Sequence, residues 1–114
     1  MRKPTTSSVH DLIPKDLLSA LPQIGETSEQ QDPLVHIKLF DPSSSWTWFV
    51  IEYDPKERIG YGYVCGFEKE LGSFDLAELE AIRTGPLKLR IERDLYFEPC
   101  RLSQLPDPYR TTFR

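Results

Sequence analysis

The sequence lacks the features that identify most membrane-spanning, secreted and metal-binding proteins. No apolar run approaches the roughly 18 residues of a membrane-spanning helix, and residues 1–8 lack the apolar stretch of a secretion signal. Cys65 and Cys100 form no Cys-x-x-Cys pair, so we expect neither a disulfide nor a zinc site. We therefore expect a cytoplasmic protein with two reduced thiols and no cofactor.

Signatures of catalysis and of nucleic-acid binding are also missing. No Gly-x-Ser-x-Gly elbow presents a nucleophile, and no glycine-rich loop opens a helix as a phosphate site. With 14 basic residues against 18 acidic ones, the net charge is −4, whereas proteins that depend on phosphate contacts usually have a basic excess. Strong direct binding to nucleic acid is thus not expected, and no catalytic residue is predicted.

What the sequence does contain is enough aromatic side chain for one compact core. The chain has 114 residues, with two Trp, five Tyr and six Phe, which matches a single domain. Residues 1–9 are rich in Thr, Ser and basic side chains and predict a flexible lead. We expect one α+β domain over residues 10–114.

The order of elements predicts an antiparallel sheet of three to four strands, two short helices on one of its faces and a C-terminal wrapping segment. One helix is predicted over residues 11–21, and a second over residues 76–83, where Asp75 and Glu78 form a capping box. Apolar and β-branched composition predicts the strands, which cover residues 34–40, 46–53, 58–67 and 87–94.

Alternation along the predicted strands divides their side chains between two faces. The first set is mainly apolar, and we expect it to form the core face under both helices: Val35, Ile37, Leu39, Phe49, Ile51, Tyr53, Ile59, Tyr61, Tyr63, Cys65, Leu87, Leu89 and Ile91. The second set mixes indoles, glycines and charges: His36, Lys38, Phe40, Trp46, Trp48, Val50, Glu52, Asp54, Gly60, Gly62, Val64, Gly66, Glu68, Glu70, Lys88, Arg90, Glu92 and Asp94.

The second face is unusual because it combines two indoles with a stripe of glycines and three acidic pairs. Glycines leave room for a close approach by a ring, a backbone or a ligand, so a shallow groove is predicted along the third strand. One interpretation is that the C-terminal segment covers the indoles with Tyr96, Phe97 and Tyr109. The other is a ligand or partner groove walled by aromatic side chains, with carboxylates at its rim.

Four ordered blocks on this face resemble a small family of uncharacterised bacterial proteins, catalogued as a domain of unknown function. The blocks are Lys38-x-Phe40, Trp46-x-Trp48-x-x-x-Glu52-x-Asp54, Gly66-x-Glu68-x-Glu70-Leu71-Gly72 and Ile91-Glu92-Arg93-Asp94. The resemblance implies a context rather than an activity: members are frequently encoded on plasmids and other mobile elements, near genes for DNA processing.

These observations predict an accessory binding protein of a mobile genetic element that docks a protein partner through an acidic, Trp-lined face. The predicted partner-binding residues are Lys38, Phe40, Trp46, Trp48, Glu52, Asp54, Gly62, Gly66, Glu68, Glu70, Glu92, Arg93 and Asp94. One alternative is a divalent-metal-dependent phosphoesterase or nuclease that uses Glu52, Asp54, Glu68 and Glu92. Another is a small-ligand-binding module over the glycines, and the chain is expected to be a monomer or weak homodimer.

Overall fold

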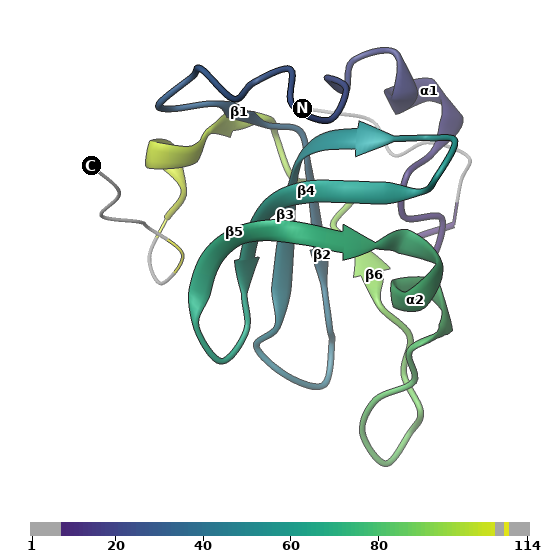
Figure 1. Ribbon diagram of the computed structural model, residues 1–114. Helices are drawn as coiled ribbons and strands as arrows, with labels where there is room; N and C mark the ends of the chain where they lie inside the picture. Colours follow the sequence, from purple (N-terminus) through teal and green to yellow (C-terminus); the bar gives the residue numbers. More distant parts are fainter. Residues whose placement is uncertain (1–7, 107–108, 110–114) are drawn as a thin grey trace.

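The computed structural model describes residues 8–106 and 109, which form an antiparallel five-stranded sheet, a two-stranded sheet and two short α-helices (Figure 1). The larger sheet has the strand order β5-β4-β3-β2-β6. Its strands are β2 (Ile37–Phe40), β3 (Thr47–Asp54), β4 (Ile59–Cys65), β5 (Lys69–Asp75) and β6 (Glu92–Arg93). In the smaller sheet β1 (Leu34–Val35) pairs with β7 (Cys100–Arg101). The predicted α+β class and antiparallel sheet are confirmed.

The two α-helices are short, and their ends follow from local chemistry. Helix α2 (Leu76–Ala81) begins where the predicted cap lies, because the Asp75 carboxylate accepts hydrogen bonds from the backbone N–H groups of Ala77 and Glu78. Helix α1 (Lys15–Leu18) occupies only the middle of its predicted range. A single turn of 3₁₀ helix, η1 (Leu102–Gln104), follows β7.

The larger sheet is covered on both faces, and this overturns the predicted position of the helices. The Trp48 face, made by Ile37, Leu39, Trp48, Val50 and Tyr53, packs against residues of both helix regions, including Leu12, Leu76 and Leu79. The Phe49 face, made by Phe49, Ile51, Tyr63 and Cys65, packs against Val35 of the smaller sheet and against Leu102, Leu105, Phe97, Cys100 and Tyr109 of the C-terminal segment. In Figure 1 the helices and the yellow C-terminal segment lie on opposite sides of the sheet.

Strand register explains why alternation alone gave the wrong assignment. Ile37 lies opposite Val50 and Leu39 lies opposite Trp48, so these two residues share a face with the indole rather than with Phe49. The register of β3 on β4 then shifts between Val50 and Glu52, which marks a β-bulge. The shift moves Tyr53 onto the Trp48 face. Every residue of β3 from Thr47 to Tyr53 is buried, so hydrophobicity does not identify which face the helices cover.

Two further strand predictions are wrong. The predicted fourth strand over residues 87–94 is reduced to β6, because the preceding residues form a turn closed by a bridge between Thr84 and Leu89. Strand β5 was not predicted, although it pairs with β4 over its whole length. Its sequence, Lys-Glu-Leu-Gly-Ser-Phe-Asp, has few β-formers because it is an outer, largely exposed strand.

Hydrogen bonds to distant residues hold both ends of the described chain in place. The Asp32 carboxylate accepts hydrogen bonds from the backbone N–H and the hydroxyl of Ser103, which anchors η1. The predicted lead over residues 1–9 lies outside the described residues except for Ser8 and Val9, and the Val9 carbonyl accepts a hydrogen bond from the Arg93 N–H. Within the described residues, no helix has the length and apolarity needed to cross a membrane.

Candidate functional site

A hollow of about 430 Å³ opens on the Trp48 face and is lined by Trp46, Val64, Phe67, Glu68, Glu70, Gly72 and Ser73; we call it the Trp46 groove. The Phe67 ring meets the Trp46 ring edge to face, with 5.3 Å between the ring centroids. The centroids of the Trp46 and Trp48 rings are 5.8 Å apart. Trp48 is buried at 7% exposure, whereas Phe67 is 95% exposed. The groove therefore joins the core to an exposed aromatic ring on the β4–β5 hairpin.

The glycine stripe of β4 is filled by this chain rather than open to a ligand. A Cβ on Gly66 would overlap the six-membered ring of Trp46, and one on Gly60 would overlap the ring of Phe74. At Gly62 a Cβ would overlap the carbonyl of Phe49, next to the bulge in β3. The glycines thus admit neighbours from this chain, and the space directly over Gly60 and Gly62 is taken by Phe74 and by the Phe49 carbonyl.

Two predicted site carboxylates have structural partners. Glu52 is 3% exposed and accepts hydrogen bonds from the Gly25 N–H at 2.7 Å, the Thr27 N–H at 2.8 Å and the Thr27 hydroxyl at 2.5 Å. Asp54 accepts bonds from the backbone N–H groups of Lys56 and Glu57, as in an Asx turn. Glu52 therefore anchors the loop that follows α1, and Asp54 shapes the β3–β4 turn.

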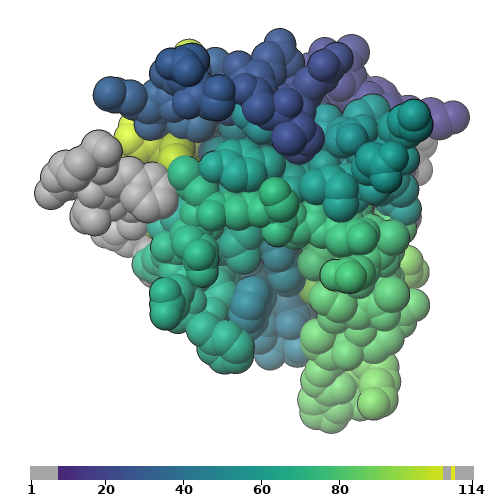
Figure 2. All heavy atoms as spheres, viewed as in Figure 1, coloured from purple at the N-terminus to yellow at the C-terminus, as the bar shows by residue number. Residues whose placement is uncertain are grey.

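Glu68 and Glu70 differ from these two because both are exposed at the Trp46 groove. Among the described residues, no cation lies within ion-pair distance of either carboxylate. Figure 2 shows the β4–β5 hairpin and the loop over residues 82–91 projecting on either side of a recess. The predicted combination of indoles and rim carboxylates is thus present at this groove, in the form of Trp46, Trp48, Glu68 and Glu70.

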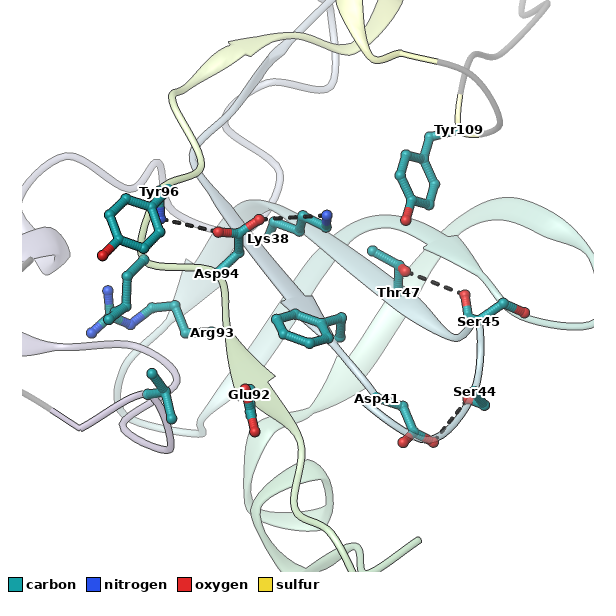
Figure 3. Close-up of a pocket in the computed structure, with 13 residues that line it drawn as sticks. Lys38, Asp41, Ser44, Ser45, Thr47, Glu92, Arg93, Asp94, Tyr96 and Tyr109 are labelled. Carbon is teal, nitrogen blue, oxygen red and sulfur yellow. Dashed lines mark hydrogen bonds and ion pairs between the residues drawn. The ribbon is translucent and has the colours of Figure 1, made fainter. Parts of the chain in front are cut away.

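A second hollow, of about 350 Å³, collects another part of the predicted set on the Phe49 face, and we call it the Phe40 pocket (Figure 3). It is lined by Lys38, Phe40, Glu92, Arg93 and Asp94, together with Val9, Asp41, Ser44, Ser45, Thr47, Leu95, Tyr96 and Tyr109. The Lys38 ammonium lies 3.5 Å from the Asp94 carboxylate and 5.3 Å from the centroid of the Tyr109 ring.

The structure therefore separates the predicted single face into two hollows on opposite faces of the sheet. Glu68 lies in the β4–β5 turn at one edge, and Glu92 lies in β6 at the other edge of the sheet. Within residues 8–106 and 109, no group of three or more His, Cys, Asp or Glu side chains is arranged to hold a metal ion. The carboxylates proposed for a metal-dependent enzyme do not converge.

Asp41 is a buried polar residue that the sequence analysis missed. Its carboxylate accepts bonds from the backbone N–H and hydroxyl of Ser43, from the hydroxyl of Ser44 and from the hydroxyl of Thr84. Burial raises the pKa of Asp41, but the hydrogen bonds outweigh burial, so the pKa lies below its ordinary value. The Asp-Pro-Ser-Ser sequence, typical of an Asx turn, was the available signal.

Neither cysteine has a pKa lowered toward the reactive thiolate, and His36 does not lie beside the serines of residues 43–45. Burial raises the pKa of the Cys65 thiol and, with Asp32 nearby, that of Cys100. Both cysteines therefore favour the unreactive thiol. Burial lowers the pKa of His36, which keeps its imidazole neutral at pH 7, and the serines of residues 43–45 lie beyond the other end of β2.

Comparison with known proteins adds a family but no activity. A family model described as "Protein of unknown function (DUF2958)" matches residues 12–107. No curated protein and no solved structure matches the chain. The function must therefore be argued from the geometry of the two hollows.

Proposed function

We propose that this chain, which belongs to the DUF2958 family, is a binding protein that docks a protein partner through the Trp46 groove. The observation that carries the proposal is Phe67: a large apolar ring at 95% exposure that is held against Trp46 at the mouth of a groove. Aromatic anchors at the centre of a patch are the side chains that dominate many protein interfaces.

The exposed Phe67 ring costs free energy as long as it stays in contact with water. Burying a Phe side chain is worth about 1.5–3 kcal/mol, or about a tenfold to hundredfold change in affinity. Trp46 is already braced by Trp48 and by the bare backbone of Gly66, so the wall of the groove is preorganised. A partner that covers Phe67 gains this apolar contact without reordering the groove.

The rim carboxylates indicate the charge of the partner. Glu68 and Glu70 flank the aromatic wall without a described cation, so a partner that brings Lys or Arg to the rim gains an ion pair. Such rim pairs contribute more to selectivity and association rate than to affinity, and salt screens them. We therefore propose a partner whose binding segment is basic and carries one apolar side chain.

Strand β5 provides a second element of recognition next to the groove. It is the outer strand of the sheet on this side, and its residues Glu70, Gly72 and Ser73 line the groove. An extended segment added to this edge forms backbone hydrogen bonds while its alternate side chains enter the groove. A Cβ built on Gly72 meets nothing within 4 Å, so the middle of the edge has free space.

The biological setting is part of the proposal and rests on the family resemblance. Because such proteins are expected on plasmids and other mobile elements, we propose that the partner belongs to the class of DNA-processing enzymes. The chain would then act as an accessory factor that occupies a basic surface of that enzyme.

The test compares proteins captured from host lysate by the wild-type chain and by matched variants. A partner of the Trp46 groove is retained by the wild type and by Leu87→Ala, which removes a different exposed side chain, 78% accessible, from the loop over residues 82–91. The same partner is lost with Phe67→Ala, and the double variant Glu68→Gln, Glu70→Gln weakens its capture at low salt. Equal capture by the wild type and Phe67→Ala would refute the proposal.

A further inference from the structure

The Phe40 pocket is formed by segments that are far apart in the sequence. Phe40 and Lys38 come from β2, Glu92 from β6, Tyr96 from the segment that follows β6, and Tyr109 from the C-terminal end of the described chain. Figure 3 shows the labelled side chains Lys38, Glu92, Tyr96 and Tyr109 around one hollow, with Tyr96 and Tyr109 on opposite sides of it. A volume of about 350 Å³ is suitable for a ligand of amino-acid size.

Most charges at this pocket already have partners. Lys38 pairs with Asp94, and Asp41 receives hydrogen bonds from three hydroxyls and one backbone N–H. Arg93 is 3% exposed, and its Nε donates to the Asp11 carbonyl at 2.9 Å. Glu92 is the exception: within the described part of the chain, its half-buried carboxylate has no hydrogen-bond donor or cation in contact.

Two aromatic rings of the pocket already contact a cationic side chain of this protein, Lys38. The Lys38 ammonium lies 5.8 Å from the centroid of the Phe40 ring and 5.3 Å from that of Tyr109, which is the geometry of a cation–π contact. Glu92 lies directly opposite Phe40 in the β2–β6 pair, so the two side chains are neighbours on one face. Tyr96, at 65% exposure, adds a further aromatic ring at the rim.

We propose that the Phe40 pocket binds an organic cation, a guanidinium or ammonium group on a short aliphatic stem, with Glu92 as its ion-pair partner and Phe40 as its aromatic wall. The carboxylate supplies the charge, and the ring faces supply the cation–π contact and apolar cover for the stem. Because Lys38 is neutralised by Asp94, it leaves the Glu92 side of the pocket available. This site is independent of the Trp46 groove, which lies on the opposite face of the sheet.

The experiment titrates the ¹⁵N-labelled chain with N-acetyl-L-argininamide and, separately, N-acetyl-L-lysinamide, and follows amide chemical shifts. The uncharged analogue N-acetyl-L-citrullinamide is the matched ligand control. We expect binding in the millimolar range, with shifts at β2, β6 and the residues around Tyr96, as suits a few contacts made by a small ligand. Comparison of the two cations identifies whether the pocket prefers the planar guanidinium or the compact ammonium.

Variants identify the residues responsible. Glu92→Gln weakens binding of the preferred cation at least about fivefold, and Phe40→Leu weakens it without removing the charge. Glu68→Gln, an equal charge change at the Trp46 groove, leaves the affinity unchanged. The proposal is wrong if neither cation shifts the pocket amides, if citrullinamide binds equally well, or if Glu92→Gln binds like the wild type. A native amide spectrum of each variant before titration shows that it is folded.

Discussion

Glu52 offers the sharpest test of the structure, because the sequence predicted it to bind a partner and the structure gives it a buried anchoring role. Replacing Glu52 with Gln keeps the size of the side chain but turns one acceptor oxygen into an NH₂ group. The two carboxylate oxygens face the N–H groups of Gly25 and Thr27. Whichever way the amide rotates, one donor then faces another donor.

The magnitude follows from the burial of the donors. Thr27 is buried and bonds to Glu52 through both its N–H and its hydroxyl, whereas Gly25 is exposed and can turn to water. The Gln amide therefore keeps its oxygen on Thr27, and the buried group left without a partner is its own NH₂, on a side chain that is 3% exposed. A buried group that loses its hydrogen-bond partner costs about 1–3 kcal/mol. We therefore expect Glu52→Gln to lose about 1–3 kcal/mol of unfolding free energy and Glu52→Ala about 2–4 kcal/mol.

Urea unfolding, followed by tryptophan fluorescence, measures the change. With a slope of about 1–3 kcal/mol per molar for a domain of this size, Glu52→Gln lowers the midpoint by about 1 M. Glu57→Gln, at an exposed position in the β3–β4 turn, makes the same charge change without a buried partner and keeps the wild-type unfolding free energy within about 0.5 kcal/mol. A double-mutant cycle with Thr27→Val gives a coupling energy of about 1 kcal/mol or more.

A Glu52→Gln variant as stable as Glu57→Gln would refute this reasoning. If that variant also lost its protein partner while keeping its stability, the partner-binding role predicted from the sequence would be correct, and the buried anchor would not. A lower midpoint with partner capture retained supports the structure.

Three further predictions rest on separate observations. Asp41→Asn loses stability near pH 7 and progressively less as the pH falls below 3.8, because the lowered pKa of Asp41 stabilises the fold above its ordinary value of 3.8 and acid protonation of the carboxylate removes this contribution. Urea midpoints between pH 7 and acid measure the change, and a variant with the same pH slope as the wild type contradicts it. Gly66→Ala loses about 1–3 kcal/mol by displacing the Trp46 ring, whereas Gly72→Ala, with open space around its Cβ, does not, so equal urea midpoints would exclude the overlap. Millimolar Mg²⁺ or Mn²⁺ leaves the melting temperature unchanged, and a rise with either ion would revive the metal-dependent alternative.

Parts of the fold could be predicted because they depend on neighbours in the sequence. The start of α2 followed from Asp75, whose carboxylate caps the first turn, and the central strands followed from runs of β-branched and aromatic residues. The close approach of a ring or a backbone at the glycines was also predicted, although the particular residues at Gly60 and Gly62 were not. For the cap and the central strands, the determining pattern spans only a few residues or a single strand.

The parts that could not be predicted depend on pairing between strands. Strand β5 has a polar composition, and its place in the sheet comes from its register with β4 rather than from its own residues. The bulge in β3 moves Tyr53 to the opposite face, which no alternation pattern along one strand reveals. Strand pairing also separates the predicted site residues, because it places Glu68 and Glu92 at opposite edges of the sheet.

The sequence by itself determined the class of fold, the α2 cap, the central strands and the presence of an indole pair together with acidic pairs. Only the tertiary structure decided that the helices cover the Trp48 face, that Glu52 is an internal anchor and that Trp46, Glu68 and Glu70 line one hollow while Lys38, Phe40 and Glu92 line another. The physical reason is that capping and strand propensity act over a few residues. The packing of segments that are distant in the sequence instead sets the strand register. It also sets which segment covers each face of a sheet that is buried on both sides.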